Sequence, residues 1–527
     1  MRKKSTLVLM LAACLTFVTA CSSSNGGSTT GESKRAAQTK VCPTVDKSAI
    51  DPSATFTWIY SVGNSSFDPD KITTNNSQMY LYPIYDSLVH VDAEGVPQPM
   101  LAKKWTIDKN GLSLRMDLIK DWTYHDGTSF DAASVKANLD RHRAAGSWNE
   151  SALEDLTGVT VVDADTVKID TKHGASALVA VLASSAGMMM SPAVFNDPKQ
   201  ALTPTGGSGA FELSGYTPGS KVEYTAVDKY WAPDTLHVAK MVYLVSGDDN
   251  ARLNSVVSGA ADSTFLRASM YEPAKKANLV VCEAPSLSSY TLSLNVSKSE
   301  FGKKEVRQAI NFAVDRNAVS AVTNGFCKPG IQMYPTSYYA SDADLKPDKY
   351  KQDVAKAKAL LKEAGVPGGF EFTLEVVNLD IYQQIAEIVQ ANLQEVGIKM
   401  NIVPVEITKL AEDYSVNKTA DAILFEQKAE SDPSIQIESY YIKGGFNNPG
   451  GYSDDAVTKF NDEGKVGATT EARAASYKKL YKAVDDSVAP NVTLCHLTTP
   501  MTMNDKTMGV EIYADASRQF RGVAIKK

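Results

Sequence analysis

The sequence has few of the residues that metal and redox sites require. Its 527 residues include six histidines and six cysteines. The histidines are spread along the chain without the spacing of metal ligands, and no two cysteines form a C-x-x-C pair. This scarcity argues against zinc and thioredoxin-like chemistry. We therefore expect no bound metal and no cofactor.

Signatures of catalysis are also missing. The patterns G-x-S-x-G, H-E-x-x-H and G-x-x-x-x-G-K-[ST] do not occur, so no motif supports a hydrolase, a metalloprotease or a phosphate-binding loop. Ser476 begins an S-x-x-K match of the kind found in exported penicillin-binding enzymes, but no S-D-N or K-T-G accompanies it. We expect a protein that is not an enzyme. The alternative from another class is an exported serine acyl-enzyme.

A concentrated basic surface and a long apolar run are absent too. The chain carries 54 Lys and Arg against 61 Asp and Glu, a formal charge of −7. Because phosphate backbones need clustered positive charge, we expect no nucleic-acid partner. After residue 20, no segment approaches the roughly 20 apolar residues of a transmembrane helix. A chain of this length should fold into about three compact units.

The N-terminus carries targeting information. Basic residues at 2–4 precede an apolar stretch over 7–20, which is too short to span a bilayer and is typical of a signal peptide. The stretch ends in V-T-A-C, which resembles the lipobox of bacterial lipoproteins and makes Cys21 the acylated residue. A similar pattern ends at Cys14, but cleavage there would leave too short an apolar region.

We therefore predict a signal peptide at 1–20, and a lipidated Cys21 that begins a flexible tether, 21–54. Two acyl chains hold a protein on a membrane stably, whereas a single chain does not. The protein would be extracytoplasmic and anchored to the cell membrane through lipid alone. Plain secretion with an incidental cysteine is the alternative.

Four cysteines remain once the signal peptide and the acylated residue are set aside. Outside the cytoplasm, an even number permits two disulfides. The sequence leaves all three pairings open among Cys42, Cys282, Cys327 and Cys495.

Apolar periodicity predicts a β-α-β unit in the second half of the chain. Residues 353–364 read as an amphipathic helix, and 370–376 alternate as a half-buried strand does. Asp380 and Gln383 fit a capping box that begins a second helix, and 398–405 return as a strand. Such a unit crosses over right-handed into a mixed or parallel sheet.

Other elements follow from turn and capping signals. A helix is predicted over 130–142 with Asp131 as its N-cap, and a hairpin over 159–170. A late helix is predicted over 470–485, followed by a strand that begins at Pro490.

Seven segments resemble, in order, the family-5 extracellular solute-binding proteins of ABC importers, which include oligopeptide-, dipeptide- and nickel-binding components. The resemblance covers essentially all of 55–527. The segments that carry it are YDSLV at 85–89, PMLAKKW at 99–105, WTYHDGTSF at 122–130, GGSGAF at 206–211, YW at 230–231, VRQAINFAVDR at 306–316 and ALLKEAG at 359–365.

Most of these segments are expected to be structural. The His-Asp-Gly at 125–127 fits a turn before the capped helix rather than acid–base chemistry. Arg307 and Asp315, placed on one predicted helix, are expected to form local ion pairs.

The resemblance implies an α/β architecture with two lobes, mixed sheets, crossing hinge strands and an extra subdomain in the first lobe. Hinge closure around a solute is the motion that such a layout permits. The crossings would lie near 287–295 and 486–494. The implied division is lobe I at 55–87, 193–285 and 487–527, the extra subdomain at 88–192, and lobe II at 286–486.

The resemblance also implies a function. The protein would capture a peptide or similar small solute between its lobes and deliver it to an ABC permease and, through that permease, to its ATPase. We expect a monomer. A binder of nickel, a metal chelate or another non-peptide solute is the alternative within the family. A lipoprotein that presents peptides to a sensor or chaperones exported chains would share the same site.

Asp432 is the most specific site candidate. It matches the Asp-Pro of peptide-binding members, in which the aspartate takes the ammonium group of the peptide, and a buried ammonium needs such a carboxylate. Two departures count against a dipeptide clamp: Phe425-Glu426 replaces the usual Gly-Trp, and 377–382 contains no Arg or Lys. A longer peptide or another amine-bearing solute survives these objections.

Further ligand-binding candidates are chosen by location, at the end of the first strand, at a crossing, on the lobe II strand and after a glycine loop. They are Tyr60, Ser61, Gly63, Asn64, Ser289, Tyr290, Phe425, Gln427 and Asn448. Three methionines at 188–190 fit either an adaptable apolar wall or core packing.

Overall fold

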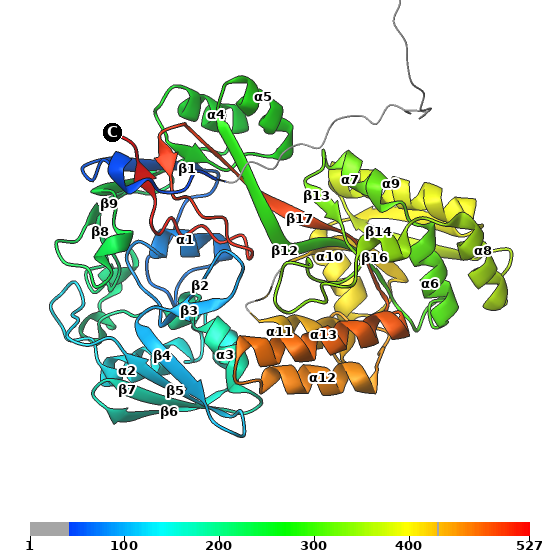
Figure 1. Ribbon diagram of the computed structural model, residues 1–527, viewed down its shortest axis with the longest axis horizontal. Coiled ribbons are helices and arrows are strands. Elements are labelled where there is room, and N and C mark those ends of the chain that lie inside the picture. Colours follow the sequence, from blue (N-terminus) through cyan, green and yellow to red (C-terminus); the bar gives the residue numbers. More distant parts are fainter. Residues whose placement is uncertain (1–41, 429, 431) are drawn as a thin grey trace, which may run out of the picture. The chain divides into compact units, whose positions relative to one another are not determined.

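The computed structural model describes residues 42–428, 430 and 432–527 (Figure 1). The predicted signal peptide, the predicted lipidation site Cys21 and most of the predicted tether lie outside these residues. The described end of the tether, 42–54, is attached to the folded body. Cys42 forms a disulfide with Cys282, and the Asp51 amide donates to the Ile525 carbonyl at 2.9 Å. The fold therefore includes a segment that the sequence analysis placed in the tether.

One mixed sheet of eleven strands organises the described chain. Ten strands follow the order β15-β14-β16-β12-β17-β11-β1-β10-β9-β8, and β13 pairs with β17 off this path. The strands are β1 (Thr55–Tyr60), β8 (Phe211–Thr217), β9 (Lys221–Ala226), β10 (Lys240–Val245), β11 (Ser263–Thr264), β12 (Val280–Leu294), β13 (Cys327–Pro329), β14 (Glu371–Val377), β15 (Lys399–Val405), β16 (Ala422–Gln427) and β17 (Asn491–Met503).

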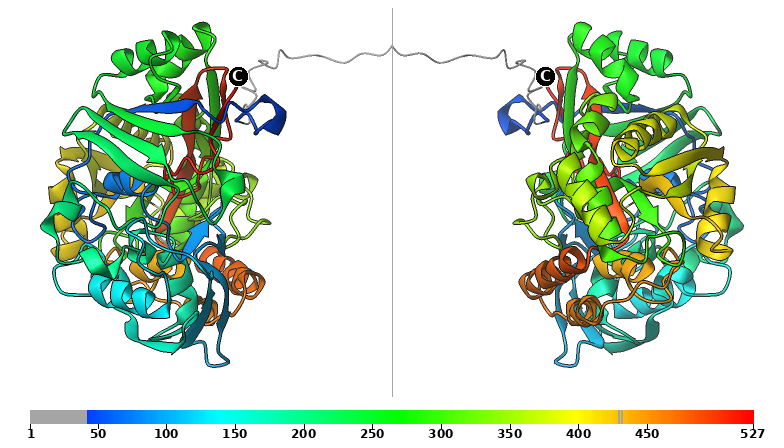
Figure 2. Two further views of the ribbon diagram at one scale, coloured as in Figure 1. Left: turned by 90° about the vertical axis from the view of Figure 1, so that its left-hand side faces the viewer. Right: turned by 90° about the vertical axis from the view of Figure 1, so that its right-hand side faces the viewer.

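Two long strands connect the halves of this sheet. β12 and β17 pair antiparallel, and both views in Figure 2 show them side by side. At one end β17 pairs with β11, and at the other end β12 pairs with β16. These strands match the predicted crossings, but the second crossing lies later than 486–494. β17 pairs with β13 as far as Leu497 and with β11 from Thr502.

Each half of the sheet has its own apolar core. The lobe I core gathers around Trp58, Tyr80 and Tyr243, with the helices α4 (Asp249–Val257) and α5 (Tyr271–Lys276) beside the sheet. The lobe II core includes residues of β14 and β16, and also Val492 and Leu494 of β17. The first part of β17 therefore packs with lobe II, although the sequence analysis assigned all of 487–527 to lobe I.

A second, four-stranded sheet has a third core. Its order is β4-β5-β7-β6, and α2 packs on it. Asp131 caps α2 as predicted, and β6 and β7 form the predicted hairpin. The elements of this unit are β4 (Ala102–Ile107), β5 (Ser113–Leu118), α2 (Ala132–His142), β6 (Leu156–Asp163) and β7 (Thr166–Thr171). Two short helices flank it in sequence, α1 (Gln78–Leu81) and α3 (Ala175–Val181). Two further strand pairs are small: β2 (Val89–Val91) with β3 (Pro97–Pro99), and β18 (Thr507–Met508) with β19 (Ala524–Ile525).

Lobe II contains the predicted β-α-β unit. β14 and β15 pair in parallel, and the helix α9 connects them. The predicted capping box is wrong: Asp380 is already the first helical residue, and Gln383 donates to the Asn378 side chain instead. The lobe II helices are α6 (Lys304–Ala313), α7 (Arg316–Val322), α8 (Val354–Glu363), α9 (Asp380–Glu395), α10 (Ile407–Ala411), α11 (Pro433–Tyr441), α12 (Asp455–Lys465) and α13 (Thr470–Ser487).

Arg307 and Asp315 do not form the predicted ion pairs. They lie on separate elements, because α6 ends at Ala313 and Asp315 is the N-cap of α7. The Arg307 guanidinium is buried and donates to four backbone carbonyls, those of Val488, Phe301, Gly302 and Ser487. It therefore ties the start of α6 to the end of α13.

Other structural expectations are confirmed. Gly127 adopts a positive φ of 82° in the turn before α2. The three methionines at 188–190 are fully buried, in the lobe I and subdomain cores. Asp86, in the first segment of the resemblance, accepts hydrogen bonds from Tyr230 and Trp231 of the YW segment. Asp86 therefore joins these two segments, whose residues contribute to the lobe I core and to the subdomain core.

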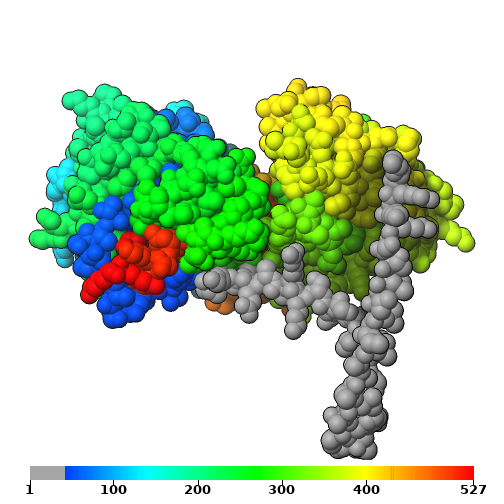
Figure 3. Space-filling model, turned by 90° about the horizontal axis from the view of Figure 1, so that it is seen from above, coloured from blue at the N-terminus to red at the C-terminus, as the bar shows by residue number. Residues whose placement is uncertain are grey.

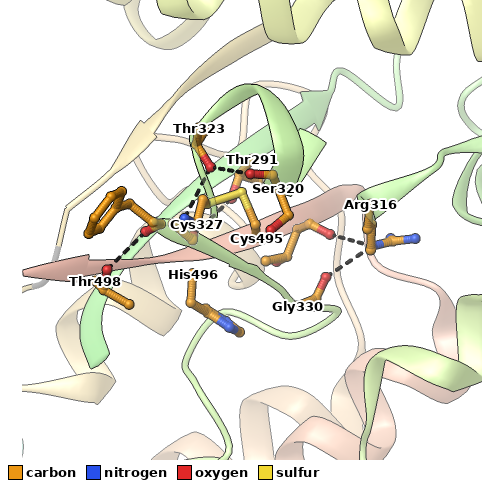
Figure 4. The surroundings of a disulfide bond; sticks show 12 residues. Thr291, Arg316, Ser320, Thr323, Cys327, Gly330, Cys495, His496 and Thr498 are labelled. Atoms are coloured by element: carbon orange, nitrogen blue, oxygen red, sulfur yellow. Dashed lines mark hydrogen bonds between the residues drawn. A yellow bond between two sulfur atoms is a disulfide. The ribbon is translucent and has the colours of Figure 1, made fainter. Parts of the chain in front are cut away.

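The four cysteines form two disulfides, Cys42–Cys282 and Cys327–Cys495. The first fixes the N-terminal segment to the lobe I end of β12. The second joins β13 to β17 inside lobe II, beside the buried Arg316 (Figure 4). Among the residues that the structure describes, no helix has the length and apolarity needed to cross a membrane.

Candidate binding cleft

The strand directions place two sets of strand ends opposite each other. β17 runs from lobe II into lobe I, and β11 and its parallel neighbour β1 run against it. β12 runs from lobe I into lobe II, and β16 and its parallel neighbour β14 run against it. The carboxyl ends of both sets therefore point toward the crossing. In α/β sheets, ligands bind beyond the carboxyl ends of parallel strands.

The surface is hollowed between the two lobes. Figure 3 shows a groove between the part that contains α4 and α5 and the part that contains α9. α9 follows β14, and α4 follows β10, which runs parallel to β1, so both helices begin at strand ends that point toward the crossing. We take this groove, with the strand ends beneath it, as the candidate binding cleft.

The lobe I wall carries an arginine between two aromatic rings. Tyr60 is the last residue of β1, and Phe265 follows β11. The guanidinium carbon of Arg518 lies 4.8 Å from the Tyr60 ring centre and 5.0 Å from that of Phe265. Burial is the main effect on the Arg518 pKa and lowers it, while Tyr60 and Asp515 raise it. Tyr60 was predicted, whereas Arg518 and Phe265 were not.

The lobe II wall brings four of the predicted residues together. Ser289 faces Gln427 across the β12–β16 ladder, Tyr290 follows Ser289 in the chain, and Phe425 lies two residues before Gln427 and pairs with Thr291. Gln427 accepts a hydrogen bond from Thr291 at 3.3 Å, and its buried amide nitrogen has no partner among the described residues. This strand end therefore holds a buried amide donor that no described residue satisfies.

An aromatic and acidic cluster lies on the other face of this ladder. The rings of Tyr290 and Tyr382 meet edge to face, 5.3 Å apart. Glu426 pairs with Tyr290 in the ladder, and burial raises the pKa of its carboxyl, although Lys428 lowers it. The sequence analysis named Glu426 only as a departure from the family pattern.

The Asp432 carboxylate is fully buried and is paired with other side chains of the protein. Its two oxygens accept from Arg473 Nη2 at 2.8 and 2.6 Å, and one of them also accepts from the Ser434 amide at 2.9 Å. Asp432 is also the N-cap of α11. These partners support a structural role that joins α11 to α13. Its ammonium-binding role stays a prediction.

The remaining predicted residues are Ser61, Gly63, Asn64 and Asn448, and their ligand role stays a prediction. Asn448 uses its side chain inside a turn, donating to the Ile442 and Tyr452 carbonyls and accepting from the Tyr452 amide. Gly63 lies against Gly219 in the turn between β8 and β9. Asn64 is buried, and its carbonyl accepts from Tyr216. Ser61 is half-buried at the end of β1.

His496 lies on β17 opposite Ser289. It is buried, its Nε2 hydrogen bonds to the Gln332 carbonyl at 2.9 Å, and burial lowers its pKa to about 4. The ring is therefore neutral at pH 7. Among residues 42–428, 430 and 432–527, no group of three or more His, Cys, Asp or Glu side chains is placed to hold a metal ion.

Two strand sets that face each other across a pair of crossing strands define a two-lobed binding protein. The model of the bacterial extracellular solute-binding proteins, family 5 Middle, matches residues 96–448. The chain belongs to this family. Its members are extracytoplasmic, bind solutes for ABC importers and hand them to the permease, without an enzymatic step.

Individual relatives agree with this assignment. The glutathione-binding protein GsiB of Escherichia coli O1:K1 is 30% identical over 355 residues, which are 65% of this chain and 68% of that protein. HbpA2 from Haemophilus parasuis has a TM-score of 0.81 at 20% identity, covering 90% of this chain and 100% of that one. The murein tripeptide binding protein MppA, in its unliganded open form, also has a TM-score of 0.81 at 20% identity, covering 91% and 98%.

Proposed function

We propose that this protein is the lipid-anchored substrate-binding component of an ABC importer and captures a peptide or similar small solute in the cleft between its lobes. The observation that carries the proposal is the meeting of the two sets of strand ends beside the crossing strands. A solute held there touches both lobes at once, so closure buries it.

A peptide-like solute is supported by the groups on the walls. Peptide amides need hydrogen-bonding partners, and the buried amide nitrogen of Gln427 at the strand end has none among the described residues. Of the predicted aromatic residues, Phe425 is half-buried and offers ring surface for an apolar side chain, whereas Tyr60 and Tyr290 are buried beneath the strand ends. The names of GsiB and MppA, which bind glutathione and a murein tripeptide, point to the same class of solute.

Closure would rotate the lobes about the middle of the crossing strands. The ladder of β12 and β17 has a register shift between Pro285 and Ser289, where the strands pass from one lobe to the other. We place the hinge there, with the lobes and the extra subdomain close to the predicted boundaries. Besides the crossing strands, Ser176 of α3 donates to the Gly467 carbonyl at 2.6 Å and joins the subdomain to lobe II.

A binding assay tests this function. Native mass spectrometry of the full chain, purified in mild detergent, should show a co-purifying molecule of a few hundred daltons. Calorimetry with glutathione, trialanine and nickel–histidine then separates a peptide-type binder from a chelate binder. X-ray scattering should show contraction when the solute that binds is added. If the protein binds none of these three solutes and no peptide-like molecule co-purifies with it, the peptide proposal is refuted.

The anchor is tested separately. Cys21→Ala should prevent acylation and move the protein from the membrane fraction to the soluble exported fraction. Cys14→Ala is the matched control, because it leaves the preferred lipobox intact. Equal membrane association of wild type and Cys21→Ala would contradict the anchor.

The acyl-enzyme alternative finds no support around Ser476. Its hydroxyl donates to the Ala472 carbonyl within α13 at 3.3 Å. The Lys479 ammonium, which would be the base, lies 5.6 Å from the Phe460 ring centre. Incubation with nitrocefin should give no turnover.

A further inference from the structure

The guanidinium of Arg518 has unusually few partners. Every other arginine in the described ranges 42–428, 430 and 432–527 is ion-paired with a carboxylate or donates to several backbone carbonyls. Arg518 makes one long hydrogen bond, from Nη1 to the Ala516 carbonyl at 3.4 Å. Its buried Nε has no partner in the described chain. A partly buried cation in this state lacks the compensation that the other arginines have.

Two aromatic rings fix the plane of this side chain. Tyr60 and Phe265 lie 6.3 Å apart at an interplanar angle of 65°, and both are about 5 Å from the guanidinium. Cations over ring faces are attracted by the ring quadrupole, and arginine is the residue most often found there. This contact orients Arg518 without using its N–H donors.

The loop that carries Arg518 is itself held on both sides. On one side, the Ala514 carbonyl accepts a hydrogen bond from the Leu287 amide of β12 at 2.8 Å, and the Ala514 amide donates to the Ala93 carbonyl. On the other side, the Phe520 ring packs 4.9 Å from the Trp58 ring. Arg518 is therefore presented by a fixed backbone, next to the crossing strands.

Its position is that of a ligand contact. Tyr60 and Phe265 mark the carboxyl ends of β1 and β11, which face lobe II across the cleft. Asp515 is near enough to influence Arg518, but it accepts from the Ser517 amide at 2.8 Å, and the two form no ion pair in the described chain. The planar fork of arginine donors matches a carboxylate in two-point geometry.

We propose that Arg518 is the anion-binding group of the cleft, and that the solute carries a carboxylate which docks on lobe I. This inference rests on the proposed function and makes it more specific. It also supplies the basic residue that is missing from 377–382, but from the opposite lobe.

Matched peptides test the inference. Trialanine and trialanine amide differ only in the C-terminal carboxylate, and both should be titrated against the full chain by calorimetry. The free acid should bind at least tenfold tighter than the amide. Arg518→Gln should remove most of that preference by weakening the acid alone, because glutamine keeps a donor but loses the charge. Arg115→Gln, on the exposed face of the four-stranded sheet, is the control and should bind both peptides as wild type does.

A second probe keeps the inference testable if neither peptide binds. Sodium acetate should raise the thermal midpoint of wild type above that in sodium chloride of equal ionic strength, and Arg518→Gln should lose this difference. Peptide binding with the same acid preference in wild type and Arg518→Gln would overturn the Arg518 assignment and leave the proposed function intact. An acetate effect that depends on Arg518, without peptide binding, would reject the peptide class and retain the anion site. Equal acetate effects in the two proteins would overturn the assignment.

Discussion

Replacing Asp432 by alanine separates a structural role from a ligand role. In wild type the carboxylate is fully buried and holds Arg473 through two oxygens at 2.8 and 2.6 Å. Alanine would leave the buried guanidinium with the Gly464 carbonyl and the Tyr477 hydroxyl, both at 3.0 Å, as partners. Removing one member of a buried ion pair costs about 3–5 kcal/mol, because the other charge stays buried without its counterion.

Urea denaturation followed by tryptophan fluorescence measures this loss. The midpoint of unfolding of Asp432→Ala should fall at an unchanged slope, corresponding to about 3–5 kcal/mol. Asp454→Ala is the matched control. Asp454 caps α12 through the Ala456 and Val457 amides without a buried ion pair, so its loss should cost only about 1 kcal/mol.

The same variant can refute the reasoning. If Asp432 is structural, the variant that remains folded should bind glutathione within about threefold of wild type. A stability loss below about 1 kcal/mol, together with an affinity loss above tenfold, would show instead that the carboxylate serves the solute.

Two further predictions concern lobe II. Replacing both Cys327 and Cys495 by serine should lower the free energy of unfolding by about 2–5 kcal/mol, since their disulfide closes a loop with a sequence separation of 168; an unchanged urea midpoint would contradict this. His496 has its pKa lowered from 6.5 to about 4 by burial, so the unfolded state binds its proton first as the pH falls. The free energy of unfolding therefore keeps the full contribution of the neutral His496 ring above pH 6.5. It falls by about 3 kcal/mol as the pH is lowered to about 4. His496→Gln, which can still donate to the Gln332 carbonyl, should flatten that part of the pH profile of stability, and an unaltered profile would reject the assignment.

The predictable parts of the fold depend on local signals. Alternating apolar residues and an N-cap aspartate act within a few positions, so the helix capped by Asp131 and the unit of β14, α9 and β15 could be predicted. The start of α9 was misjudged because Gln383 bonds outside the helix, to Asn378, and does not reach back to an N-cap. Local sequence cannot distinguish these two acceptors.

The site was predicted only in part because its contacts join distant segments. Tyr60 and Tyr290 follow from the ends and crossings of strands, which the family pattern supplies. Arg518 lies more than 400 positions from Tyr60 in sequence, and no motif connects the two. The ion pair of Asp432 with Arg473 could not be predicted for the same reason, because no sequence motif connects an acid in a loop to an arginine in a distant helix. The disulfide pairing could not be predicted either, because it depends on which cysteines lie close together in the folded chain.

The Cys42–Cys282 disulfide attaches the N-terminal segment covalently to lobe I. Cys282 pairs with Met501 on the lobe I side of the crossing strands. If Cys21 is acylated as proposed, a pull on the anchor would reach lobe I through this covalent link without passing through the hinge. Lobe II would then be the lobe that moves during closure, and the pull would not change the angle between the lobes.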